Sequence, residues 1–121
     1  MRGALPMALI ALALSMAHAP AQVRSPVAID ADDIGGVVTS ARGPEAGVWV
    51  IAETTDLPTK MNRIVVTDDQ GRYLVPDLPR ETYDVWVRGY GLVDSARVKA
   101  TPGKALNLTA VVAPDPRTAA Q

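Results

Sequence analysis

The chain has 121 residues, and its 12 Lys and Arg residues against 13 Asp and Glu residues give a formal net charge of −1. That length fits one domain, and the near-neutral balance lacks the basic footprint of a nucleic-acid-binding protein. No Cys is present, so disulfides and thiolate metal sites are excluded.

The first 21 residues have the layout of a secretory signal peptide. Arg2 provides a positive start, residues 5–17 are almost wholly apolar, and small residues follow at Ala19 and Ala21. The apolar run is too short to span a bilayer, which needs about 20 residues. Cleavage after Ala19 or after Ala21 fits this layout, and we predict Ala21, because a cut after Ala19 would leave Pro20 just past the scissile bond. We therefore predict a periplasmic or secreted protein with no membrane span after cleavage.

Cleavage after Ala21 would remove Arg2 and His18 together. Loss of Arg2 leaves 12 − 1 = 11 basic residues against 13 acidic ones, a formal charge of −2. Because His18 is the only His, the mature chain would lack the commonest acid–base group at neutral pH and the imidazole of most nucleophilic pairs and zinc sites. The sequence therefore predicts no catalytic residue, metal or cofactor, and a protein that is not an enzyme.

Residues 22–33 are expected to form an exposed leader, because they mix Pro26 with aspartates. The carboxylates of Asp30, Asp32 and Asp33 raise the alternative of a calcium site, since carboxylate oxygens are calcium ligands. Acidic runs are more often solvated surface, and no loop here is seen to wrap an ion. No metal is therefore assigned to this segment.

Seven short strands are expected after the leader, at a spacing of roughly ten residues and separated by Gly, Pro and Asp. Apolar and polar side chains alternate along them, which is typical of half-buried strands, and no helical stripe occurs. This pattern predicts an antiparallel sandwich or barrel. The expected strands are residues 34–40, 46–54, 63–68, 72–75, 82–89, 94–100 and 105–112. The expected core residues are Val48, Val50, Tyr73, Val75, Leu78, Tyr83, Val85 and Val87.

Two turns frame the short strand at residues 72–75. The first contains Asp69 and Gly71, and Gly provides a positive φ without steric cost. The second contains Pro76 and Pro79, which remove ladder donors and so end the strand. After the last strand, residues 114–121 are small, polar and proline-bearing, and we interpret them as a flexible tail or linker.

These segments resemble the carboxypeptidase regulatory-like family in four places. Gly35-Gly36-Val37-Val38 is similar to its glycine-bearing first strand, and residues 43–50 resemble G-P-L-A-G-V-x-V. Residues 67–73 match T-D-x-x-G-R-Y, and residues 78–85 match L-P-x-G-x-Y-x-V. Glu81 stands where the family usually has Gly, so we expect either strain at Glu81 or a different turn.

The resemblance covers about residues 34–112 and implies a transthyretin-like fold, a seven-stranded antiparallel Greek-key β-sandwich, for a domain at residues 34–113. Members of the family are mostly accessory modules beside enzymes, extracellular binding proteins or membrane receptors, and the zinc carboxypeptidase domain is absent from this sequence. Fold alone does not assign an activity. The resemblance implies an exported, non-catalytic accessory module for protein interaction or structural support.

Trp49, Ile51 and Trp86 are the candidate binding residues. Alternation places them opposite the core-facing set, and transthyretin-like sandwiches place the second and fifth strands side by side. We therefore expect one patch on the outer face of a sheet, which would bind another protein or domain. Exposed aromatic rings also stack on sugars, so a carbohydrate-binding module that binds a glycan is the alternative function. For the rings themselves, the alternative is burial under a loop or the leader.

Overall fold

The structure is a computed structural model that describes residues 27–119, and these residues fold as an all-β sandwich. The predicted signal peptide, residues 1–21, lies outside the described residues. Within residues 27–119, no helix is long and apolar enough to cross a membrane. The strands are β1 (Ile34–Ser40), β2 (Gly43–Pro44), β3 (Trp49–Thr54), β4 (Met61–Val66), β5 (Arg72–Val75), β6 (Tyr83–Arg88), β7 (Leu92–Val93), β8 (Val98–Ala100), β9 (Lys104–Ala105), β10 (Leu108–Thr109) and β11 (Val111–Val112).

β1 is the centre of the first sheet. It pairs antiparallel with β5, with Ile34 opposite Val75, and with β2 through a tight hairpin. On its other side, β1 pairs in parallel with β9 and β10. The sheet is therefore mixed, although the sequence predicted antiparallel pairs alone. The reason is that the chain leaves β8 in the second sheet, crosses to the first sheet, and then runs in the same direction as β1.

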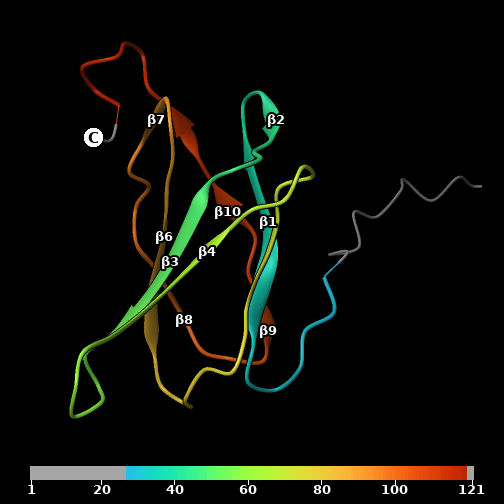
Figure 1. Cartoon of the computed structure of the whole chain (residues 1–121), viewed down its shortest axis with the longest axis vertical. Coiled ribbons are helices and arrows are strands. Elements are labelled where there is room, and N and C mark those ends of the chain that lie inside the picture. Colours follow the sequence, from blue (N-terminus) through green and yellow to red (C-terminus); the bar gives the residue numbers. More distant parts are fainter. Residues whose placement is uncertain (1–26, 120–121) are drawn as a thin grey trace, which may run out of the picture.

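The second sheet contains four antiparallel strands in the order β4-β3-β6-β8. Ile51 on β3 lies opposite Trp86 on β6 and opposite Ile64 on β4. The expected second and fifth strands are thus neighbours, as the resemblance implied. β7 and β11 form a separate short antiparallel pair. Figure 1 shows the two layers side by side, with β3, β4 and β6 in one and β1, β9 and β10 in the other.

The core lies between the two sheets and confirms the predicted inward face. All eight predicted core residues are 4% exposed or less. Burying that apolar surface is the dominant favourable term in folding. Leu108 and Ala110 join the same core, as the alternation at residues 105–112 indicated.

The last expected strand, residues 105–112, is divided: side chains interrupt its ladder between β9 and β10, and β11 leaves β1 to pair with β7. The side-chain oxygen of Asn107 accepts a hydrogen bond from the backbone N–H of Val37 at 3.0 Å. Just before it, the backbone oxygen of Leu106 accepts a hydrogen bond from the Tyr73 hydroxyl at 2.5 Å. These two bonds replace backbone pairs that a continuous strand would make.

For the turn before β6, either strain at Glu81 or a different turn was expected, and the structure has a different turn. Among the described residues, Asp77 is the one non-glycine residue with a positive φ, at 55°. Asp tolerates this left-handed region better than most residues. Glu81 therefore carries no backbone strain of this kind, and the absence of Gly at position 81 is explained by the turn.

Candidate functional site

The outer face of the β4-β3-β6-β8 sheet brings the predicted binding residues together. On β3, Trp49 and Ile51 point away from the core, because Val50 between them is fully buried. Trp49 lies opposite Val66 on β4, and Ile51 lies between its partners on β4 and β6. We call this set the outer patch; it contains Trp49, Ile51, Ile64, Val66 and Trp86.

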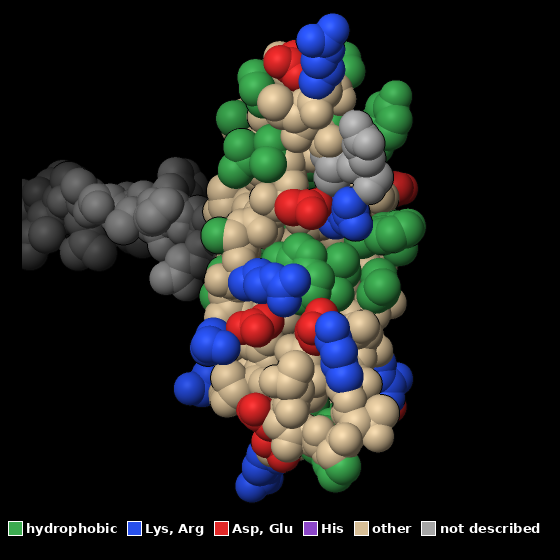
Figure 2. Space-filling view, turned by 90° about the vertical axis from the view of Figure 1, so that its left-hand side faces the viewer, with side chains coloured by type: hydrophobic (Ala, Val, Ile, Leu, Met, Phe, Trp, Pro, Cys, Tyr) green, Lys and Arg blue, Asp and Glu red, His purple; other side chains and the backbone are tan. Residues whose placement is uncertain are grey.

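Three members of the outer patch expose large apolar surfaces. Trp49 is 50% exposed, Ile64 is 55% exposed and Val66 is 57% exposed. Ile51 is only 8% exposed, although it also points outward, because its neighbours across the strands surround it. Figure 2 views the molecule from this side and shows hydrophobic side chains gathered near the middle of the face, with charged side chains beside them.

The two tryptophans differ in what covers them. Trp49 and Trp86 lie on adjacent strands as diagonal neighbours, because Trp86 is opposite Ile51. The guanidinium carbon of Arg97 lies 3.9 Å from the centre of the Trp86 ring, a cation–π contact that covers part of that ring. The half-exposed ring of Trp49 excludes its burial under a loop, which was the alternative interpretation.

Charged side chains around the outer patch are paired with one another. Lys60 lies 2.8 Å from Glu53, and Lys99 lies 3.0 Å from Asp84. Glu53 and Asp84 are themselves opposite each other on β3 and β6, in the row next to Ile51. Exposed pairs of this kind contribute little stability. In each pair a positive charge balances a negative one, so these four residues beside the outer patch carry no net charge.

Ile64 and Val66 were not among the predicted site residues. The run Ile64-Val65-Val66 does contain the necessary signal, because alternation puts its first and last side chains on the same face. Which face that is depends on Val65, which is partly buried and packs against the core. Their contact with Trp49 depends on the β3–β4 register, which no local pattern specifies.

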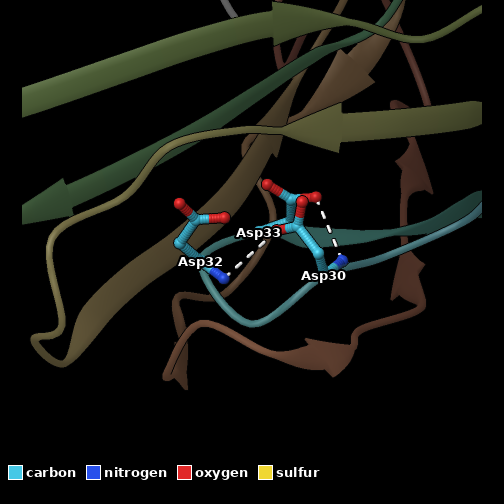
Figure 3. Close-up of side chains that lie close together, drawn as sticks. All are labelled: Asp30, Asp32 and Asp33. Atoms are coloured by element: carbon cyan, nitrogen blue, oxygen red, sulfur yellow. Dashed lines mark hydrogen bonds between the residues drawn. The ribbon is translucent and has the colours of Figure 1, made fainter.

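Asp30, Asp32 and Asp33 lie close together at the end of the leader (Figure 3). Asp33 also links this segment by hydrogen bonds to the loops that contain Asp77 and Gly103. The carboxylate of Asp33 accepts hydrogen bonds from the backbone N–H of Asp30 at 3.1 Å and of Asp77 at 3.4 Å. The backbone oxygen of Asp33 accepts a further bond from Gly103 at 2.7 Å. The leader was expected to be exposed. Its last residue, Asp33, is instead only 5% exposed and is held by these hydrogen bonds.

The same cluster has the composition of a cation site. Ligand oxygens of Asp30, Asp32 and Asp33 lie within 4.8 Å of one another. Exposed acidic groups at such distances are common without an ion, and the Asp33 carboxylate already accepts two backbone hydrogen bonds. The arrangement is accounted for by turn capping, which stabilises the end of the leader.

Comparison with known proteins supports the fold and leaves the family open. No family model matches the chain, and no curated protein matches it. A structure described as a streptococcal ancillary pilin is similar, with a TM-score of 0.56 and 17% sequence identity. The match covers 72% of this chain and 31% of the pilin chain, so this chain spans about a third of that protein. At this identity the similarity shows a shared β-sandwich fold.

Proposed function

We propose that this chain is an exported, non-catalytic β-sandwich module of the carboxypeptidase regulatory-like type that binds another protein through the outer patch. The observation that carries the proposal is the half-exposed ring of Trp49, which lies beside the exposed side chains of Ile64 and Val66. Clusters of large apolar side chains at a surface are typical of docking sites, and Trp is enriched among the residues that dominate binding energy.

Two features support the family and the setting. The matched motifs occupy the structural positions that such motifs require: Gly71 has a positive φ and Tyr83 is buried at the start of β6. The similar pilin, like this chain, is a β-sandwich, and the signal-peptide layout of residues 1–21 supports export. Together they support a periplasmic or secreted accessory module.

The contact between Arg97 and Trp86 favours a protein partner over a glycan. Sugar rings stack on open aromatic faces, and the Arg97 guanidinium occupies part of the Trp86 ring. Trp49 is therefore the one ring of the outer patch available for stacking. Its neighbours Ile64 and Val66 are branched aliphatic side chains, which provide apolar contact but no stacking surface.

Iodide quenching tests the exposure on which the proposal depends. Trp86→Phe leaves Trp49 as the only fluorophore of its kind, and we expect strong quenching of this variant because half of the ring is exposed. Trp49→Phe leaves Trp86, which we expect to be quenched more weakly beneath Arg97. Absence of quenching in both variants would contradict the outer patch as a binding surface.

Binding itself is tested with a photo-crosslinking residue placed at position 66, beside Trp49, in the chain produced in its native host. We expect a discrete crosslinked protein that disappears when Trp49→Ala is added. The matched control is Tyr90→Ala, which removes a fully exposed aromatic ring outside the outer patch and should leave the crosslink intact. A glycan array probed with the same variants supports the alternative if binding is found there and is lost with Trp49→Ala.

A further inference from the structure

Arg97 borders the outer patch on the side of β8. Its guanidinium carbon lies over the Trp86 ring, 3.9 Å from the ring centre, and its side chain is exposed. Lys99, two residues further along, points to the same face and pairs with Asp84 on β6. Arg97 therefore belongs to the outer face of this sheet and lies beside the apolar side chains gathered there.

The backbone before β8 holds Arg97 in this place. If the register of β6 and β8 continued past their last pair, Val87 would lie opposite Ala96. Instead, Val87 bonds to Ser95: its backbone oxygen accepts from the Ser95 N–H at 3.0 Å, and its N–H donates to the Ser95 hydroxyl at 2.8 Å. The chain thus has one extra residue here, as in a β-bulge, and both Ala96 and Arg97 face Trp86. Bulges redirect side chains and are frequent beside functional sites.

The positive charge of Arg97 is not balanced by a carboxylate among residues 27–119. Its contact with the Trp86 ring is the one interaction that its guanidinium makes there. Three other cations around the outer patch each have a carboxylate partner, at 2.8, 3.3 and 3.0 Å: Lys60 with Glu53, Arg88 with Asp94 and Lys99 with Asp84. Each of these pairs cancels its own charge, so Arg97 makes this side of the outer patch positive.

Contact with the ring leaves the N–H groups of Arg97 available to a ligand. A guanidinium that lies on an aromatic face uses its plane for that contact, while its five N–H donors point outward from its edges. This fork of donors matches the two oxygens of a carboxylate, and such bonds are among the stronger hydrogen bonds in proteins. Because the ring already restricts the long side chain, binding would cost less side-chain entropy than at an unrestrained arginine.

We propose that the protein partner of the outer patch carries an Asp or Glu side chain that binds Arg97, while apolar side chains of the same segment pack on Trp49, Ile64 and Val66. This inference rests on the function proposed above and adds the chemistry of the partner. Charge complementarity supports it, because an unbalanced cation lies beside an exposed apolar surface. A basic segment would meet a like charge, and a wholly apolar one would cover the guanidinium without giving it an acceptor, which is costly.

Selection from a phage-displayed library of random peptides tests this chemistry. On the purified full chain, we expect the enriched peptides to combine apolar residues with an Asp or Glu, and to lose binding when Trp49→Ala is introduced. On Arg97→Glu, which reverses the charge beside Trp86, the same library should enrich Lys or Arg in place of the acidic residue. If Arg97 only covered the ring, its replacement would not reverse the charge that the surface prefers.

Titration of a selected peptide gives the second measurement, by fluorescence anisotropy of the labelled peptide. Replacing its acidic residue by the matching amide should raise the Kd about threefold to tenfold on the wild type, between the effects typical of exposed ion pairs and of charge-assisted hydrogen bonds. On Arg97→Gln the two peptides should bind equally. Lys99→Gln is the matched control: it removes a cation of the same face that Asp84 already pairs, and should keep the preference for the acidic peptide.

The outcomes separate this inference from the proposed function. Peptides that depend on Trp49 but show no preference for an acidic residue would overturn the inference and leave the outer patch as a binding surface. Equal loss of that preference in Arg97→Gln and Lys99→Gln would also overturn it, because the net charge of the face would then explain the effect. A selection that enriches no peptide dependent on Trp49 would contradict the binding surface itself, and this inference with it.

Discussion

Gly71 allows the chain to turn between β4 and β5. Its φ is +76°, and its backbone N–H donates to the oxygen of Asp68 at 2.9 Å. The Asp68 carboxylate accepts bonds from the backbone N–H of Gln70 and Arg72, each at 2.9 Å. The bond from the Arg72 backbone lowers the pKa of Asp68 below its ordinary value, so the turn keeps its charged cap as the pH falls.

The substitution Gly71→Ala should destabilise the protein more than Gly91→Ala does. Both glycines have nearly the same φ, +76° and +73°, so both substitutions incur the left-handed penalty of about 1–2 kcal/mol. Only at Gly71 would the new Cβ lie 2.6 Å from a backbone oxygen, that of Val38, whereas at Gly91 no atom lies within 4 Å. Urea unfolding of the two variants measures the difference, and equal losses would contradict a steric role for this contact.

At the scale of the element, Tyr83 fixes the start of β6. Its ring is 1% exposed, and its hydroxyl donates to the backbone oxygen of Pro79 at 2.6 Å, four residues earlier. A tyrosine whose hydroxyl bonds to the backbone a few residues earlier resembles the tyrosine corner, a motif of β-sandwiches. The bond ties the proline-bearing turn to the strand that pairs with β3.

Removing only this hydroxyl with Tyr83→Phe should cost about 1–3 kcal/mol, because the Pro79 oxygen would lose its partner in a part-buried setting. Tyr83→Ala should cost about 3–5 kcal/mol through loss of the ring. Free energies of unfolding from urea titration give both values. Tyr90→Phe, at a fully exposed ring, is the control and should leave stability unchanged.

At the scale of the whole molecule, Tyr73 links segments on both sides of β1. It lies on β5 and is 3% exposed, while its hydroxyl reaches the backbone oxygen of Leu106, between β9 and β10. Burial raises the pKa of Tyr73 well above its ordinary value of 10.0, because the phenolate would lose its hydration. Tyr83 is shifted upward for the same first reason.

Stability should therefore fall as the pH rises above 10. A group whose folded pKa is raised contributes stability that is complete below its unfolded pKa, here 10.0, and is lost as the pH rises toward the folded value. Tyr73→Phe should lower stability at neutral pH but make the alkaline decline shallower. Urea midpoints at neutral pH and above pH 10 test this, with Tyr90→Phe expected to decline like the wild type.

The sequence by itself determined the inward face of the sandwich, because period-2 alternation assigns each side chain to a face without knowledge of its partners. It also determined the turn at Gly71, where local chemistry alone requires a positive φ. The eight predicted core residues and the outward direction of Trp49 and Trp86 follow from these local rules.

Only the tertiary structure decided which residues of other strands contact each face. Strand register and sheet order arise from contacts between distant segments, so alternation does not reveal that Ile64 and Val66 join Trp49, or that Arg97 covers Trp86. The same holds for the parallel pairing of β1 with β10 and for the division of the last strand at Asn107, whose side chain takes a backbone partner from the ladder. Pairing across a sheet is set by the whole chain, which is why these features required the fold.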